Sequence, residues 1–302
     1  MSGIITTGTL PKAMWPGINE WWGTDYKELP VEWSDLFDTE TSDKAYEEDV
    51  GITGFGLAPV KPQGSAIQFD SETQDYLTRY THVAYALGYI VTWEEMRDNQ
   101  YEKVARRRTK GLAFSMRQTK ETVGANVYNR GFNASYPIGD GAALFSASHP
   151  TLAGNQSNLL TAADISEVAI EDACIQIAGA LNGRGLKISI MPRSLIVPRQ
   201  IWFEANRILK STLQNDTANN AVNVLKATNA IPDGVKMNHY LTDADAWFVR
   251  TNAPSGAKHF SRDPIMFGED NDSDTKNQKY MAYERYSFGV TDWRGVFGNA
   301  GA

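Results

Sequence analysis

Residues 93–132 read WEEMRDNQYEKVARRRTKGLAFSMRQTKETVGANVYNRGF, and this proline-free stretch is predicted to form one long helix. At 1.5 Å per residue it would span roughly 60 Å, whereas a compact domain of this chain's length is only about 50 Å across. Charged side chains fill much of its surface. The stretch therefore indicates a helix that crosses the whole subunit with one narrow apolar stripe, formed by Trp93, Met96, Val104, Leu112, Met116, Val123 and Val127.

A glycine-rich segment precedes this helix. Residues 46–70 read YEEDVGITGFGLAPVKPQGSAIQFD, and residues 81–92, THVAYALGYIVT, are predicted to form a strand that leads into the helix. The pattern predicts a long hairpin with its tip near residues 59–65. Because two strands alone are only marginally stable in water, we expect the hairpin to lie against another subunit. Lys61 at the tip would contact that neighbour or simply keep an exposed turn soluble.

Residues 1–45 contain several tryptophans and prolines but little periodicity. Such a segment can bury its large rings only by lying on something else. We expect an N-terminal arm, packed either on its own domain or on a neighbouring subunit.

The second half of the chain alternates helices and strands. Residues 133–160 are polar and are predicted to form a loop between two lobes. Residues 161–185 are predicted to form a helix, with Thr161 or Asp164 as N-cap and Asn182-Gly183 as the stop signal. The apolar face predicted for this helix comprises Ile165, Val168, Ile175, Ile177, Ala178 and Leu181.

The remaining elements complete an α+β fold of high contact order, because the hairpin, the long helix and the terminal strand come from opposite ends of the sequence. We predict buried strands at 186–191 and 194–198, a helix at 199–211, a strand–turn–strand at 235–252, a loop at 261–278 and a final strand from Lys279.

The amino-acid composition limits the classes of protein to which the chain can belong. The chain has 302 residues, 42 % hydrophobic and 22 % charged, with a net charge of −7, so a dedicated nucleic-acid binder is disfavoured. The single cysteine, Cys174, excludes an internal disulfide. Neither a signal peptide nor a membrane-spanning apolar run is recognisable. We expect a soluble chain made in a reducing cytoplasm, with no membrane partner.

No catalytic or metal-binding constellation is recognisable. The four histidines are scattered, and His149 in the string SASHP is interpreted as part of a polar loop. Asp270, Asp272 and Asp274 imitate the start of a calcium loop, but Thr275 stands where the turn glycine belongs. We therefore predict no enzyme activity and no cofactor or metal site.

The only strong basic cluster is the run Arg106-Arg107-Arg108-Thr109-Lys110, within the long helix. Consecutive residues point around a helix, so they cannot form one basic stripe. Glu102, four residues before Arg106, allows a local ion pair. The cluster is interpreted as a solvated or intersubunit ion-pairing surface, with contact to enclosed nucleic acid as the alternative.

The order of arm, hairpin, long helix, second lobe and closing strand resembles the major capsid proteins of tailed bacteriophages, which have the Hong-Kong-97-type fold. Particular strings resemble the Mu-like and related major head subunits. These are LFSASHPTLAG (144–154), SLIVPRQIWFEANRILKS (194–211), YLTDADAWFVRTN (240–252) and, most family-like, ERYSFGVTDWRGVFG (284–298). The resemblance covers most of the chain from about Tyr46 onward.

This resemblance implies a division of the chain into parts. Residues 1–45 would form the N-terminal arm and 46–81 the extended hairpin loop. A peripheral domain would comprise 82–134 and 273–302, with its spine helix at 93–132, and an axial domain would comprise 135–272. Some relatives cross-link a hairpin lysine to a neighbouring asparagine, but no catalytic glutamate can be matched here, so no such bond is predicted for Lys61.

The implied function is self-assembly into hexamers and pentamers of an icosahedral phage head that encloses double-stranded DNA. Portal, scaffolding or decoration proteins would be further partners, and assembly would take place in the host bacterial cytoplasm. The residues expected at intersubunit contacts are Trp15, Trp21, Trp22, Phe55, Lys61, Arg106, Arg107 and Arg108. Two alternatives stay open, namely an encapsulin-like nanocompartment shell and a cytoplasmic α+β enzyme with an unrecognised active site.

Overall fold

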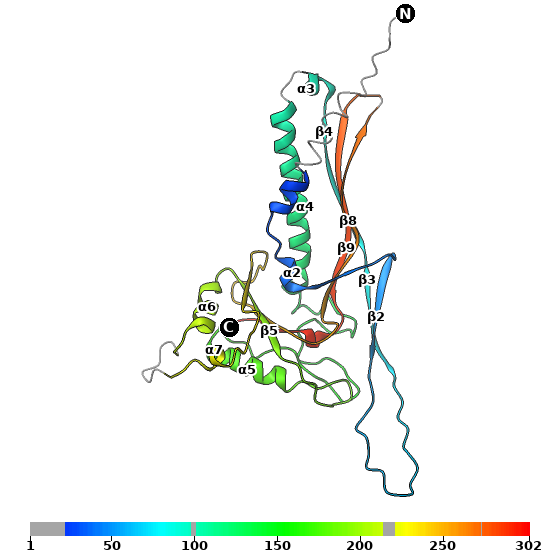
Figure 1. Cartoon of the computed structure of the whole chain (residues 1–302), viewed down its shortest axis with the longest axis vertical. Coiled ribbons are helices and arrows are strands. Elements are labelled where there is room, and N and C mark those ends of the chain that lie inside the picture. Colours follow the sequence, from blue (N-terminus) through cyan, green and yellow to red (C-terminus); the bar gives the residue numbers. More distant parts are fainter. Residues whose placement is uncertain (1–21, 98–100, 214–220, 273) are drawn as a thin grey trace, which may run out of the picture. The chain divides into compact units, whose positions relative to one another are not determined.

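The computed structural model describes residues 22–97, 101–213, 221–272 and 274–302 (Figure 1). By its internal contacts the chain divides into two compact units. Unit 1 comprises the described part of Met1–Val31, His82–Thr122 and Ser261–Ser287; unit 2 comprises Glu32–Thr81, Val123–Phe260 and Phe288–Ala302. Each unit therefore unites segments that are distant in the sequence, in agreement with the predicted high contact order.

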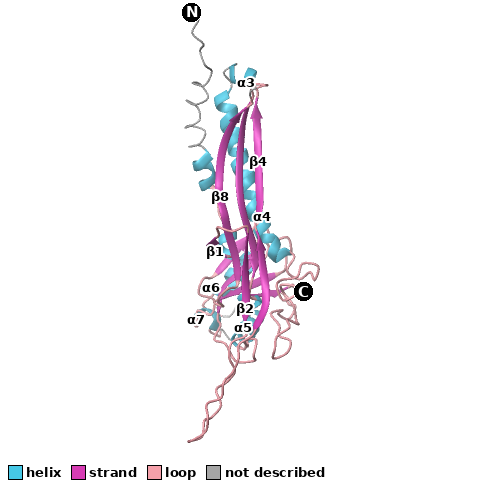
Figure 2. Ribbon diagram, turned by 90° about the vertical axis from the view of Figure 1, so that its right-hand side faces the viewer, coloured by secondary structure: helices cyan, strands magenta, loops and turns pink. Residues whose placement is uncertain are grey.

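Long strands and a helix form unit 1. β4 (Val83–Val91) pairs antiparallel with β9 (Gln278–Val290) over its whole length. Within unit 1 the strand order is β8-β9-β4, with β8 at Ala257–Asn271, while β1 (Asp38–Thr41) falls in unit 2. Figure 2 shows β4 and β8 running alongside α4 (Tyr101–Asn129). The strand predicted at 81–92 and the closing strand predicted from Lys279 are thus confirmed.

Alternation along the strands places one face of this sheet on α4. Ala282 in β9 is fully buried against Leu112 and Met116 of α4. Residues 22–28 are helical and contribute Trp22 and Tyr26 to the same cluster. Because side chains alternate with period two in a strand, the opposite sheet face carries the exposed residues of β4 and β9.

The predicted long helix is present with different ends. α3 spans Trp93–Arg97 and α4 spans Tyr101–Asn129, while residues 98–100 lie outside the description. The helix ends before Phe132 because a turn follows, in which the Gly131 N–H donates to the Tyr128 carbonyl oxygen at 2.9 Å. A Cβ at Gly131 would lie 2.5 Å from the Phe145 ring, so glycine is required there.

A small mixed sheet organises unit 2, in the order β10-β7-β5-β6. β5 (Pro192–Pro198) pairs parallel with β6 (Val235–Asn238) and antiparallel with β7 (Trp247–Thr251). The C-terminal β10 (Val296–Asn299) joins the other edge of β7. The predicted strands at 194–198 and 235–252 are therefore confirmed, whereas 186–191 contains only an isolated bridge at Lys187.

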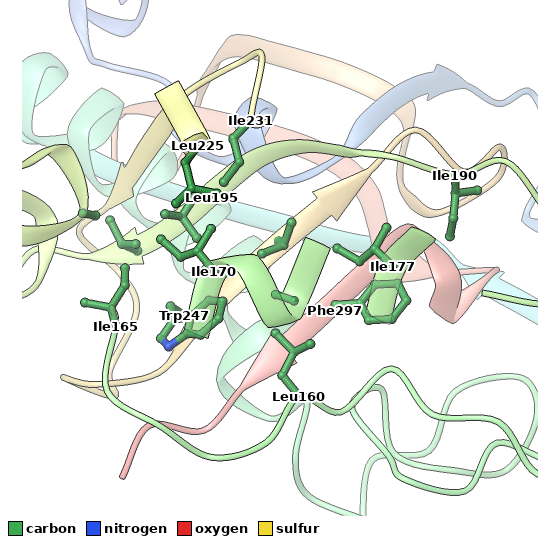
Figure 3. Packing of buried hydrophobic residues seen from close by; sticks show 14 residues of the cluster. Leu160, Ile165, Ile170, Ile177, Ile190, Leu195, Leu225, Ile231, Trp247 and Phe297 are labelled. Carbon is green, nitrogen blue, oxygen red and sulfur yellow. The ribbon is translucent and has the colours of Figure 1, made fainter. Parts of the chain in front are cut away.

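Helices pack on both faces of this sheet. The further helices of the unit are α2 (Trp33–Leu36), α5 (Glu167–Ala178), α6 (Trp202–Lys210), α7 (Val224–Ala227) and the short 3₁₀ helix η1 (Trp293–Gly295). Figure 3 shows Ile170 and Ile177 of α5 packed toward Leu195 of β5, Trp247 of β7 and Phe297 of β10. The β5 run SLIVP is continuously buried because apolar residues pack on both of its faces.

The N-cap and the end predicted for the 161–185 helix are wrong, and only Ile165 and Ile177 of its predicted apolar face are buried in the core. Its N-cap is Ser166, whose hydroxyl oxygen accepts from the Ala169 N–H at 3.1 Å, and it ends at Gly179. The true apolar stripe is Ile170, Ala173 and Ile177, spaced by three and four residues. Val168 and Ile175 face outward instead.

The loop predicted at 261–278 is also wrong, because most of it belongs to β8. Its acidic residues and Pro264 were typical of a loop, but Ile265 and Phe267 pack on the Trp22 cluster of unit 1. Tertiary packing thus outweighs local propensity here. A proline is tolerated in a strand only where its missing N–H is not needed for pairing.

The predicted hairpin is confirmed. β2 (Tyr46–Ile52) pairs antiparallel with β3 (Gln74–Thr81), from Tyr46 opposite Thr81 to Ile52 opposite Gln74. Residues 53–73 form the loop between them. Its turn, where the Ser65 N–H donates to the Pro62 carbonyl oxygen at 3.2 Å, lies within the predicted tip.

Candidate assembly surfaces

The hairpin loop carries large apolar side chains into solvent. Leu57 is 82 % exposed, Val60 92 % and Phe69 95 %, and Phe55 and Ile67 are more than half exposed. Folded monomers rarely leave such a row of apolar groups in water, and larger patches of this kind mark contacts with other molecules. Of the described residues, these form the most exposed apolar group within one segment.

Hydrogen bonds hold the loop in a defined position. The Asp70 carboxylate accepts from the Gly56 N–H at 2.8 Å and from the Arg184 guanidinium at 3.2 Å, and Arg184 also donates to the Ser71 carbonyl oxygen. The backbone N–H groups of Gly56 and Ser71 lower the pKa of Asp70, so it is ionised at neutral pH. The two arms of the loop are thereby bonded to each other and to Arg184, elsewhere in unit 2.

The base of the hairpin is anchored more deeply. Asp49 in β2 accepts from the Lys258 ammonium and from the Thr291 hydroxyl, both at 2.8 Å. Tyr80 in β3 is buried, with its hydroxyl 2.6 Å from Thr291 Oγ1 and its ring against Phe260. A rigid base presents the exposed loop without further ordering, which lowers the entropic cost of binding.

Asn158 organises the polar segment that follows α4. Its side-chain N–H groups donate to the carbonyl oxygens of Leu144, Trp293 and Val296, and its oxygen accepts from the Ser146 N–H. The side chain is fully buried, so each of these bonds replaces one that water would otherwise make. It joins the segment at 137–160 to the start of β10.

His149 lies beside Asn158 and is also fully buried. Its Nε2 is 2.9 Å from Asn158 Oδ1, its Nδ1 is 2.6 Å from the Asp140 carboxylate, and its ring stacks on Trp293. The loop histidine of the SASHP string is therefore a structural core residue, and every ring nitrogen has a partner.

A second buried polar cluster lies in unit 1. The Lys120 ammonium of α4 donates to the Glu284 carboxylate of β9, and Tyr26 donates to the same carboxylate at 3.4 Å. Arg117 donates to the Tyr26 carbonyl oxygen and covers its ring. Burial lowers the pKa of Lys120, an effect that Glu284 opposes. Pairing makes these charges tolerable in the interior and fixes α4 against β9.

A sequence model of the family described as phage capsid protein matches residues 75–299, about three quarters of the chain. The chain belongs to this family. No match is found among curated proteins.

Solved capsid structures have the same fold as this capsid protein. The capsid of an empty GTA particle superposes with a TM-score of 0.57 at 11 % identity, over 91 % of each chain. A structure from Mycobacterium phage Che8 gives 0.53 at 15 % identity, over 91 % of this chain and 97 % of the other. A virus-like particle from Pyrococcus furiosus gives 0.52 at 9 %, over 93 % and 97 %. The predicted Hong-Kong-97-type fold is confirmed.

Membership of the family makes the chain a structural protein of the virion capsid, and a capsid subunit associates with further copies of itself. Within the described residues, no group of three His, Cys, Asp or Glu side chains is placed to hold a metal ion. Nor does the described part of the chain contain a helix that is long and apolar enough to cross a bilayer.

The predicted contact residues of the capsid protein occupy different environments. Phe55 and Lys61 are exposed on the hairpin loop. Trp22 is only 4 % exposed, and its ring stacks on Phe267 at 4.9 Å between centroids, so its burial is explained within its own unit. Trp15 and Trp21 lie outside the described residues.

The arginine cluster of the capsid protein is split. Arg106 and Arg107 are exposed, whereas Arg108 is half-buried and pairs with Glu95 of α3 at 2.9 Å. This division follows from the helical period, as expected for consecutive residues. The basic cluster was predictable from the sequence. The Asn158 and His149 network was not, because most of its partners are backbone groups from distant segments, which no sequence motif marks.

Proposed function

We propose that this chain is the major capsid protein of a tailed phage, assembling into the hexamers and pentamers of an icosahedral head that encloses double-stranded DNA. The exposed apolar hairpin loop carries the proposal, because Leu57, Val60 and Phe69 lack cover in the single subunit. In a shell, this loop lies on a neighbouring subunit, and every copy both gives and receives such a contact.

The proposed parts follow the resemblance seen in the sequence. An arm at 1–45 and the hairpin at 46–81 reach neighbours, the peripheral domain at 82–134 and 273–302 contains α4, and the axial domain at 135–272 contains α5 and α6. The net charge of −7 agrees with enclosure of DNA without sequence-specific binding. Portal, scaffolding or decoration proteins complete the head, which assembles in the host cytoplasm.

Negative-stain microscopy of the chain expressed alone and purified tests this proposal. Uniform shells or ring-shaped capsomers are the expected result. A population of isolated, compact particles of subunit size at micromolar concentration would contradict it.

An encapsulin-like nanocompartment shell is the second candidate. The similar virus-like particle of Pyrococcus furiosus supports a closed protein shell, and both a phage head and a nanocompartment are shells of this kind. The contents of particles made in the native host distinguish the two. Double-stranded DNA supports the phage head, whereas a bound protein cargo without DNA supports the nanocompartment.

Reversing the charge of the exposed arginines is expected to impair shell assembly or DNA packaging. Arg106→Glu with Arg107→Glu places two anions where two cations lie on the surface of α4, and their attraction to a neighbour or to DNA becomes repulsion. Yields of shells and of DNA-filled heads measure the effect. Arg106→Lys with Arg107→Lys is the charge-preserving control, and full assembly and packaging by the reversed variant would assign the pair to solvated surface.

A further inference from the structure

α5 presents an acidic and apolar stripe outward. Val168 and Ile175, 65 % and 70 % exposed, are seven residues apart and therefore lie on one face two turns apart. Asp172 lies between them and is exposed, and Glu171 is beside it. No lysine or arginine occurs anywhere in residues 161–178, whereas four carboxylates do: Asp164, Glu167, Glu171 and Asp172.

α6 presents a basic and apolar stripe with the same spacing. Phe203 is 72 % exposed, and Arg207 and Lys210 follow it by four and seven residues on the same exposed face. Lys226 of α7 adds a third cation, because its ammonium donates to the Lys210 carbonyl oxygen at 2.8 Å. The opposite face of α6 packs into the core through Ala205.

The two stripes are opposite in charge and equal in length. In each, the first and last side chains are seven residues and about 10 Å apart; α5 has two apolar side chains around Asp172, whereas α6 has Phe203 followed by Arg207 and Lys210. Asp172 comes four residues after Val168, and Arg207 comes four after Phe203, so the two charges meet at the centre in a parallel or an antiparallel pairing. Among the described residues, neither Asp172 nor Arg207 nor Lys210 forms an ion pair.

We propose that α5 of one copy packs on α6 of another copy, with Asp172 opposite Arg207 and Phe203 against one of the two apolar side chains that flank Asp172, Val168 in a parallel pairing or Ile175 in an antiparallel one. The inference rests on the proposed function, since it names a surface that joins subunits within the shell. The Phe203 ring contacts Trp202 of its own helix and is still 72 % exposed, and complementary charges across an interface give the contact specificity. The α5 stripe of each copy therefore binds the α6 stripe of a second copy.

Charge reversal with rescue tests the contact. Asp172→Arg and Arg207→Asp are each expected to reduce the fraction of protein in shells or rings at least tenfold, and the double variant is expected to restore most of it. Asp164→Arg and Arg199→Asp, exposed charges outside the stripes, are the matched controls and should assemble as the unchanged chain does. Sedimentation measures assembly, and thermal melting of the soluble subunit measures folding.

Each outcome decides the question. Single variants that assemble like the controls would overturn the contact while leaving shell formation intact. Failure of the double variant to recover assembly, with unchanged melting, would overturn the pairing of Asp172 with Arg207. A lowered melting temperature for Arg207→Asp alone would overturn it as well, because Arg207 would then serve its own chain, where it lines a small pocket with Ser166 and Glu167. An unchanged chain that forms no assembly would overturn both this contact and the proposed function.

Discussion

Deletion of residues 56–65 is expected to abolish shells while leaving a folded, soluble subunit. The deleted segment contributes no residue to the buried clusters of either unit, and it includes the exposed Leu57 and Val60. The hairpin base keeps its anchors at Asp49 and Tyr80. Each large apolar side chain contributes roughly 1.5–3 kcal/mol when buried, and about 1.4 kcal/mol is a factor of ten in association. Electron microscopy and circular dichroism measure assembly and folding.

A variant of unchanged length separates side-chain contacts from loop length. Replacing Leu57, Val60, Ile67 and Phe69 by serine should also prevent shells without lowering the melting temperature, since all four side chains are exposed. Gln63→Ser with Gln68→Ser, two exposed polar changes in the same loop, is the control. Normal shells from the deletion and from the serine variant would rule out an intersubunit role for the hairpin.

Asn158→Ala is expected to destabilise unit 2 by about 3–5 kcal/mol, because it removes the Asn158 donor from the Leu144 and Val296 carbonyl oxygens and the Asn158 acceptor from the Ser146 N–H, while the Trp293 oxygen keeps the Val296 N–H. His149 Nε2 loses its Asn158 partner at the same time. Denaturant unfolding followed by tryptophan fluorescence measures the loss, and the Trp293 ring that stacks on His149 supplies a local signal.

Asn271→Ala is the matched control for this effect. Asn271 is exposed at the end of β8, and substitutions at such sites usually change stability by less than about 0.5 kcal/mol. A loss below about 1 kcal/mol for Asn158→Ala would show that water satisfies the freed groups and that Asn158 does not organise the segment.

Local patterns in the sequence predicted much of the fold. The Gly- and Pro-rich string at 46–70, followed by the alternating THVAYALGYIVT, was enough to predict β2, β3 and β4. The helical period at 93–132 predicted α4, although its end depended on the contact between Gly131 and Phe145. The terminal strand β9 was recognisable because Tyr280, Ala282 and Tyr286 alternate with exposed or half-exposed residues.

Elements that depend on distant partners were not predictable in this way. β8 looks like a loop until Ile265 and Phe267 are seen to pack on Trp22, more than two hundred residues away. The cap of α5 depends on a choice among Thr161, Asp164 and Ser166 that local propensity leaves open, since each is a good N-cap residue. The exposure of Val168 and Ile175 was missed because both fit a helical apolar period.

Some candidate contact residues were predicted correctly and others were not, because local sequence describes exposed loops but does not show which residues distant segments bury. Exposure of Phe55 and Lys61 follows from a turn-rich loop, which local sequence describes well. Burial of Trp22 required the tertiary position of residues 22–28. The complementary stripes on α5 and α6 became visible only when the inward face of each helix was known.

Sedimentation velocity of the purified full-length chain tests the central claim most directly, namely that this protein is a subunit of a closed shell. The account predicts that most of the protein sediments as assemblies many times heavier than the 33.5 kDa chain. A single species at the mass of one chain, at every concentration up to the solubility limit, would contradict it.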